Sequence, residues 1–281
     1  MKPCISQATT MSTPFDADLP AFARGGWPAF EIWLTKLETF LEDHTVQEAR
    51  GLIDARGLVA AAAAGQGGLL LSKGAERQLH WDHFRRRLAI LHDLGVSLLI
   101  VAADHARDFS AADYHRAADA LREAAELAGD SGVRIALEFQ KDAGFCTSLD
   151  TALALLDQSG SSNVGICLDL FHYYTGASKF EDLAYLSADN LAWVQLCDVS
   201  GRPRELAGDS DRILPGDGDY QIGPVLDQLG RIGYAGYVSL EVLNPQLWQV
   251  PCARLADLGH QAVCRALGSW NASVSQPRGG P

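Results

Sequence analysis

Four largely apolar segments between residues 133 and 242 each carry, near their carboxyl ends, a side chain that bears oxygen. These side chains are Glu138, Asp169, Gln195 and Glu241. Side chains alternate between the two faces of a strand, so each of the four points away from its aliphatic neighbours. Carboxylates that converge without a cation repel one another, and a buried carboxylate needs a partner. The matching positions therefore predict a divalent metal site.

The predicted ligands all bind through oxygen, which favours Mn²⁺ or Mg²⁺, with Co²⁺ and Zn²⁺ as alternatives. Such a metal holds two adjacent oxygens of a hydroxy-ketone and polarises its carbonyl group. Glu138 and Glu241 would lie on opposite sides of the substrate, where one removes a proton and the other returns it. The competing interpretation is that these side chains face solvent, or pair with Arg134 and Arg212.

Two cationic or titratable side chains are predicted to contact the substrate. His172 follows Asp169 by three residues, at the rim of the site, where it would bind a hydroxyl or shuttle a proton. Arg212 lies in a loop with a Pro-Gly turn and would clamp substrate oxygens. The alternative for Arg212 is a salt bridge to Asp209 or Asp211.

Further polar and aromatic side chains follow the predicted strands of the first half. Lys36 and Gln66 are predicted to bind substrate as parts of the pocket wall. Glu31 and His105 are weighed as wall residues in the same way. Trp33 would form an apolar wall, although packing in the core is the more usual role of a large aromatic side chain.

The elements that must position these residues alternate between strand and helix. Apolar segments predict strands at 4–10, 29–34, 58–64, 96–103, 133–139, 164–170, 192–198 and 236–242. Helices are predicted at 19–24, within 36–56 with a break near His44, and at 81–94, 111–128, 148–158, 180–186, 224–232 and 251–267. The alanine run in 58–64 favours a helix by propensity, but its place in the alternation favours a strand.

Eight such units predict an α/β protein with a single (β/α)₈ TIM barrel over residues 1–268 and a flexible tail at 269–281. A doubly wound open sheet is the structural alternative. In a barrel of this kind, catalytic groups lie at the carboxyl ends of the strands. The four oxygen-bearing side chains occupy such ends.

Charge and composition restrict the class of protein. The chain has 281 residues and a formal net charge of −12, which argues against a nucleic-acid binder. It has no apolar run of about 20 residues, so no membrane span is expected. None of its six cysteines forms a C-x-x-C pair, which predicts free thiols. We therefore expect a soluble, cytoplasmic protein whose partner is a small molecule, with homo-oligomerisation as a further option.

Several stretches together resemble the xylose-isomerase-like barrels of the sugar isomerase/epimerase group, and within it the inosose (2-keto-myo-inositol) isomerases. The stretches are ATT (8–10), FEI (30–32), ALEF (136–139), LDLFH (168–172), DRILPGDG (211–218) and VSLEV (238–242). The resemblance covers about residues 1–268. It implies metal ligands at Glu138, Asp169 and Glu241, and substrate contacts at His172 and Arg212.

One position departs from the family pattern. The third ligand of the family is usually a histidine, and Gln195 stands there. The dehydroshikimate dehydratases of the superfamily resemble this chain in having glutamine at that place. The resemblance thus implies a metal-dependent sugar or cyclitol isomerase or epimerase, with a dehydratase of a cyclic hydroxy-ketone as the alternative. A non-catalytic sugar-binding barrel is the third hypothesis.

Overall fold

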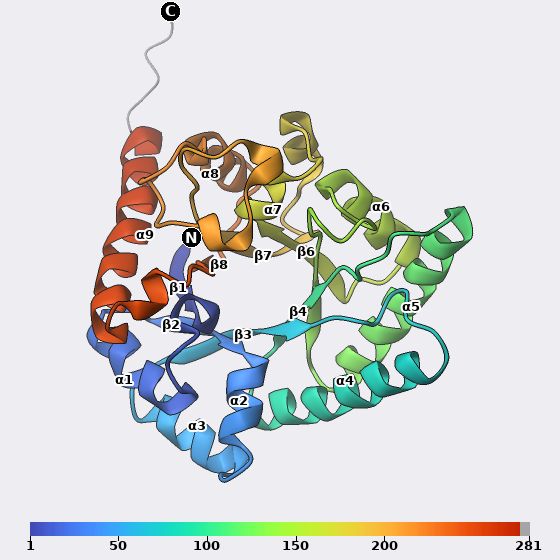
Figure 1. Ribbon diagram of the computed structural model, residues 1–281, viewed down its shortest axis with the longest axis horizontal. Coiled ribbons are helices and arrows are strands. Elements are labelled where there is room, and N and C mark those ends of the chain that lie inside the picture. Colours follow the sequence, from blue (N-terminus) through green and yellow to red (C-terminus); the bar gives the residue numbers. More distant parts are fainter. Residues whose placement is uncertain (276–281) are drawn as a thin grey trace, which may run out of the picture.

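The chain folds as a closed barrel of parallel strands in the order β1 to β8, surrounded by helices (Figure 1). A computed structural model describes residues 1–275. The strands are β1 (Lys2–Ser6), β2 (Ala29–Trp33), β3 (Val59–Gln66), β4 (Leu98–Ala102), β5 (Arg134–Glu138), β6 (Val164–Asp169), β7 (Leu191–Leu196) and β8 (Tyr237–Leu240). The predicted TIM barrel is confirmed, including the strand in the alanine-rich segment, and the open sheet is excluded.

The helices mostly follow the predicted positions. They are α1 (Phe15–Arg24), α2 (Leu34–Phe40), α3 (Val46–Asp54), α4 (Gly74–Leu94), α5 (Ala111–Asp130), α6 (Leu149–Ser159), α7 (Leu170–Thr175), α8 (Ile222–Arg231) and α9 (Cys252–Ser275). The break expected near His44 separates α2 from α3, because Thr45 and Glu48 form a capping box that starts α3.

Some boundaries differ from the sequence prediction. Strand β1 ends at Ser6, because residues Gln7–Thr10 form a 3₁₀ helix. The segment predicted as a helix at 180–186 is a 3₁₀ helix, Phe180–Tyr185. Helix α9 continues to Ser275, past its predicted end. The rest of the predicted tail, 276–281, lies outside the described residues.

Two groups of buried side chains build the core. The larger group lies between the strands and the outer helices, and contains residues such as Phe30, Ile166 and Leu240. The smaller group fills the barrel interior with mostly small side chains, among them Cys4, Ala62, Ala136 and Cys167, and with the indole of Trp193. Small residues on neighbouring strands leave space for the polar side chains above them.

Two further features agree with the composition. None of the helices in the described part of the chain combines the length and apolar character that a membrane crossing needs. All six cysteines are free thiols, as predicted. The most exposed of them is Cys264 on α9, and Cys4, Cys146, Cys167 and Cys197 are buried.

Candidate active site

A small cavity of about 110 Å³ lies at the carboxyl ends of the strands. Its walls are Trp33, Ala64, Gly65, Ile100, Ala102, Glu138, Gln140, His172, Gln195, Asp209, Arg212, Glu241 and Leu243. Five of the residues singled out for chemistry therefore meet here, from β5, α7, β7, the loop after β7 and the position directly after β8. The alternation of side chains turns these groups into the barrel, and Asp169, next to them, is paired with Gln195 across β6 and β7.

Arg212 lies in the middle of the acidic group. Its Nη1 donates to Oδ2 of Asp169 at 2.8 Å and to Oε2 of Glu241 at 3.3 Å. Its Nε and Nη2 donate to Oδ1 of Asp209 at 2.9 and 2.8 Å. The side chain is only 2% exposed, and its guanidinium lies 4.4 Å from the ring centre of Phe171. The sequence left open whether the acids pair with Arg212. Arg212 does form these pairs, so Asp169 has a direct partner within the protein.

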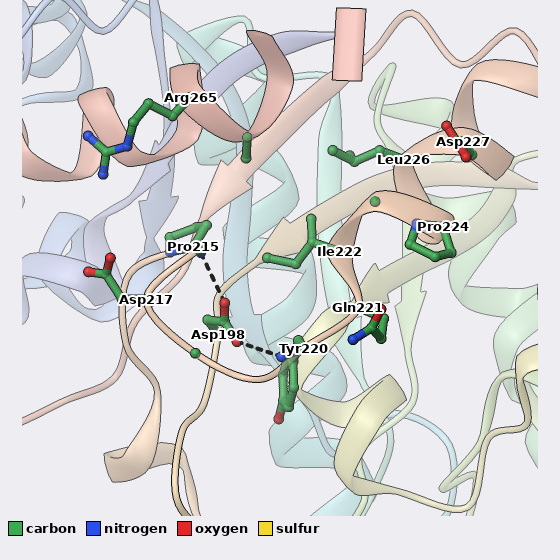
Figure 2. Close-up of a pocket in the computed structure, with 14 residues that line it drawn as sticks. Asp198, Pro215, Asp217, Tyr220, Gln221, Ile222, Pro224, Leu226, Asp227 and Arg265 are labelled. Atoms are coloured by element: carbon green, nitrogen blue, oxygen red, sulfur yellow. Dashed lines mark hydrogen bonds between the residues drawn. The ribbon is translucent and has the colours of Figure 1, made fainter. Parts of the chain in front are cut away.

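The loop that carries Arg212 is fixed by Asp198, at the end of β7. The carboxylate of Asp198 accepts backbone N–H groups of Val199, Gly216 and Tyr220, and two of these bonds are drawn in Figure 2. This loop, with α8 and α9, lines an outer hollow of about 710 Å³. Both carboxylate oxygens of Asp198 already accept backbone N–H groups, so we assign this side chain the role of holding the loop in shape. A side chain at Gly218 would meet Oδ1 of Asp198 at 2.3 Å.

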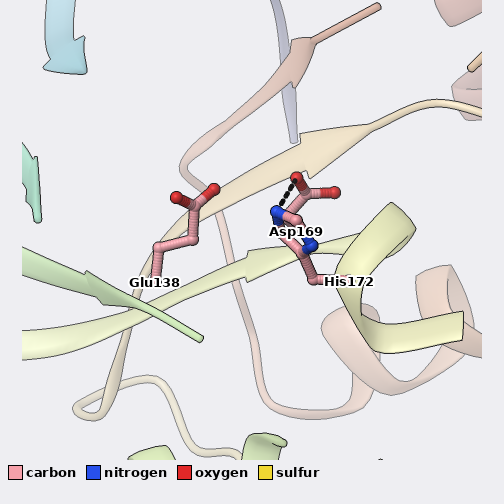
Figure 3. A group of neighbouring side chains, drawn as sticks. All are labelled: Glu138, Asp169 and His172. Atoms are coloured by element: carbon pink, nitrogen blue, oxygen red, sulfur yellow. Dashed lines mark ion pairs between the residues drawn. The ribbon is translucent and has the colours of Figure 1, made fainter. Parts of the chain in front are cut away.

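Glu138, Asp169 and His172 form a group in which one ligand atom of each lies within 4.8 Å of the others (Figure 3). All three are buried. One oxygen of Glu138 accepts a hydrogen bond from Nε2 of Gln140 at 2.9 Å. Burial, and then the charge of Asp169, raise the pKa of Glu138 to about 8.

The ring of His172 is held from two sides. Its Nδ1 faces the backbone N–H of Lys141 at 3.4 Å, and its Nε2 lies 3.7 Å from Oδ2 of Asp169 and 3.5 Å from Nη2 of Arg212. A donor at Nδ1 and a carboxylate at Nε2 favour the neutral tautomer that carries its proton on Nε2. Burial lowers the pKa of His172, which also favours the neutral ring. In this state the Nε2–H group of His172 is a potential donor.

Gln195 lies where the sequence placed it, but it presents its amide nitrogen to the acids. Nε2 donates to Oε1 of Glu31 at 3.0 Å and to Oε1 of Glu241 at 2.9 Å. Oε1 accepts the thiol of Cys167 at 3.2 Å. The expected ligand oxygen therefore points away from the carboxylates. Two acceptors on one side of the amide decide this orientation.

Glu31 is the main residue that the sequence undervalued. The sequence predicts it only as part of the pocket wall, whereas it is fully buried and hydrogen-bonded to Gln195 and Trp193. The signal was present, because Phe30 and Ile32 alternate with Glu31 just as aliphatic residues alternate with the other acids.

Two predicted substrate contacts lie outside the cavity lining. Nζ of Lys36 donates to Asp18 and to the carbonyl of Thr10, both at 2.7 Å, so its charge is already paired. Gln66 accepts Nη1 of Arg87 at 3.2 Å. It lines a neighbouring depression of about 650 Å³ that shares Trp33, Gly65, Ala102 and Gln140 with the cavity. Lys36 lines another hollow, next to α2.

A divalent cation suits the charge of this site. Glu138, Asp169 and Glu241 are buried together, and Arg212 supplies one positive charge. Among the described residues, Glu138 makes no ion pair, and burial with the charge of Glu31 raises the pKa of Glu241. Uncompensated carboxylates of this kind are hard-cation ligands. The residues present therefore fit a metal held by carboxylate oxygens.

The raised pKa of Glu138 has a consequence for stability. A carboxyl group whose pKa is about 8 in the folded state and 4.5 when free binds more protons folded than unfolded between these values. The contribution of Glu138 to the free energy of unfolding is fully present below pH 4.5 and is lost as the pH rises to about 8. We expect the free energy of unfolding of metal-free protein to fall across this range, and less so for Glu138→Gln. Urea unfolding at several pH values measures the free energy of unfolding of the wild type and of Glu138→Gln. The same pH dependence in both proteins would contradict a raised pKa at Glu138.

Comparisons with known proteins give a consistent picture. The family model described as xylose isomerase-like TIM barrel matches residues 20–262. An inosose isomerase of Halalkalibacterium halodurans is 25% identical over 259 residues, covering 89% of this chain and 90% of that protein. A 3-dehydroshikimate dehydratase of Pseudomonas aeruginosa is 28% identical over 165 residues, covering 58% of this chain and 26% of that protein.

Among solved structures, the IOLI protein with a bound zinc atom superposes with a TM-score of 0.91 at 21% identity, covering 96% of this chain and 99% of that one. This likeness concerns the fold. The family match spans most of the barrel, from within α1 to within α9. The chain belongs to the xylose isomerase-like TIM barrel family.

Proposed function

We propose that this protein is a divalent-metal-dependent isomerase or epimerase of a sugar or cyclitol that acts by proton transfer through an enediolate. The observation that carries the proposal is that Glu138 and Glu241 reach one buried cavity from different strands, beside Asp169. Two carboxyl groups in one cavity provide an acid and a base for the two carbons of a hydroxy-ketone. The relative named inosose isomerase supports a cyclitol ketone as substrate.

The proposed ion is Mn²⁺ or Mg²⁺, with Co²⁺ or Zn²⁺ as alternatives, held by Glu138, Asp169 and Glu241. When bound, it would polarise a substrate carbonyl. Gln195, predicted as a fourth ligand, would instead support the site by holding Glu241, because its amide nitrogen faces Oε1 of Glu241 at 2.9 Å. The zinc in the IOLI structure supports a metal in this type of barrel.

The other polar residues have separate roles. Glu138 and Glu241 exchange the proton between the two substrate carbons. His172, neutral and protonated on Nε2, would donate to a substrate hydroxyl. Arg212 directs its N–H groups at Asp169, Asp209 and Glu241, so its first role is to hold the carboxylates, and a substrate oxygen would share those donors.

The second candidate is a dehydratase of a cyclic hydroxy-ketone of the 3-dehydroshikimate or inosose type. It is favoured by Gln195, which takes the place of the family's usual histidine, and by the dehydratase relative. Both reactions begin with removal of the proton next to the carbonyl. They differ in the next step, in which a dehydratase expels a hydroxyl group from the neighbouring carbon.

One experiment tests the metal and separates the reactions. Chelator-treated protein, with and without added Mn²⁺ or Mg²⁺, is incubated with inososes, ketoses and 3-dehydroshikimate. We expect turnover only with metal, and an isomerised product by NMR without new ultraviolet absorbance. Absorbance of a conjugated or aromatic product would identify the dehydratase. Stoichiometric metal binding without turnover, or no metal binding at all, would favour a sugar-binding barrel.

A further inference from the structure

Glu31 is a buried carboxylate beneath the site that the proposed reaction does not use. It lies on β2, has no exposed surface, and does not line the catalytic cavity. Its Oε2 accepts Nε1 of Trp193 at 2.7 Å, and its Oε1 accepts Nε2 of Gln195 at 3.0 Å. Among the described residues it makes no ion pair. Such a carboxylate is costly to bury, so these hydrogen bonds must hold it.

Gln195 connects Glu31 to Glu241. Its two amide protons are directed at two different carboxylates, one on β2 and one at the end of β8. The reversed amide would place its oxygen against carboxyl oxygens of both acids, so the acceptor Oε1 of Glu31 favours the observed orientation. Among the described residues, the other hydrogen-bond partner of Oε1 of Glu241 is Oγ of Ser6, at 3.4 Å. The contact from Gln195, at 2.9 Å, is therefore the shorter restraint on that oxygen.

We propose that Glu31 is a positioning residue, which orients the carboxylate of Glu241 through the amide of Gln195. The consequence for metal binding and turnover rests on the proposed function, in which Glu241 binds the metal and exchanges the proton. A glutamine in place of Glu31 offers its own amide protons to the oxygen of Gln195. The amide of Gln195 is then free to reverse, and Oε1 of Glu241 loses its shorter hydrogen bond, while the longer contacts of Glu241 with Ser6 and Arg212 remain.

The first readout needs no metal. In protein with ¹⁵N-labelled glutamine side chains, the Gln195 signal is identified by its loss in Gln195→Ala. We expect its amide protons to exchange slowly in the wild type and rapidly in Glu31→Gln. Asp18→Asn is the matched control, because Asp18 is equally buried but bonds Lys36 and Gln7 away from the cavity. Unchanged exchange in Glu31→Gln would overturn the proposal.

The second readout is Mn²⁺ affinity, which we expect Glu31→Gln to weaken by about 10- to 100-fold. In a double-mutant cycle, Glu31→Gln should cost nothing further once Gln195 is alanine. Additive losses would mean that Glu31 acts by another route and would overturn the proposal. A wild type that binds no Mn²⁺ would contradict the proposed function, while the exchange experiment still decides the role of Glu31.

The test depends on Glu31→Gln folding, and Trp193→Phe is a second variant in case it does not. Replacing a carboxylate that lacks an ion pair by its amide is expected to leave the melting temperature of Glu31→Gln unchanged or higher. If that variant does not fold, Trp193→Phe removes another donor to Glu31 and keeps an aromatic ring. It should also speed exchange of the Gln195 amide protons, by a smaller factor than Glu31→Gln does. No change in this variant would also count against the proposal.

Discussion

Glu241→Gln is expected to lower kcat by about 10²- to 10⁴-fold while the protein remains folded. The amide keeps the shape of the side chain but cannot take up a proton and is a poorer metal ligand. Stability should not suffer, because burial and the charge of Glu31 already raise the pKa of Glu241. Removing this charge relieves repulsion, so the melting temperature is expected to stay the same or rise. Product NMR and circular dichroism measure the two quantities.

The matched control for this variant is Glu38→Gln, on the outer side of the barrel. Glu38 binds Arg87 through two hydrogen bonds of 2.7 Å and also contacts His83. Loss of this partner should lower the melting temperature and leave kcat unchanged, the reverse of the Glu241 result. Full turnover in Glu241→Gln would rule out Glu241 as the acid or base.

The barrel and the convergence of Glu138, Asp169, Gln195 and Glu241 could be predicted from local patterns. Side-chain alternation fixes which residues face inward, and a closed parallel barrel brings all carboxyl ends of the strands together. These two rules need no knowledge of contacts between distant side chains. The same two rules place Glu31 inward on β2, between the aliphatic or aromatic side chains of Phe30 and Ile32.

Contacts that depend on loops and on long side chains could not be predicted in this way. Arg212 lies in a loop whose course depends on the carboxylate of Asp198, and only the folded loop places the guanidinium beside Asp169. Lys36 follows a strand end, as expected of a substrate contact, yet a partner on α1, Asp18, occupies its charge. A flexible side chain binds the nearest acid, and the sequence does not show which acid that is.

Arg212→Met is expected to be the most destabilising of the proposed changes, by about 3–5 kcal/mol in the free energy of unfolding of metal-free protein. Methionine fills much of the same space against Phe171 but leaves Asp169 and Glu241 buried without their cation. A divalent ion at these carboxylates would replace the lost charge. Mn²⁺ at about 100 times its Kd adds about 2.7 kcal/mol to any protein that binds it, and more where binding is tighter.

The rescue by metal is what separates a metal site from a purely structural ion pair. Arg87→Met is the control, because Arg87 is also a buried arginine but is paired with Glu38 and not with the carboxylates of the cavity. Both variants should lose stability in urea unfolding without metal, but Mn²⁺ should raise the midpoint more for Arg212→Met than for Arg87→Met or the wild type. Equal effects of Mn²⁺ on all three proteins would mean that the carboxylates around Arg212 pair with the arginine and do not bind a metal.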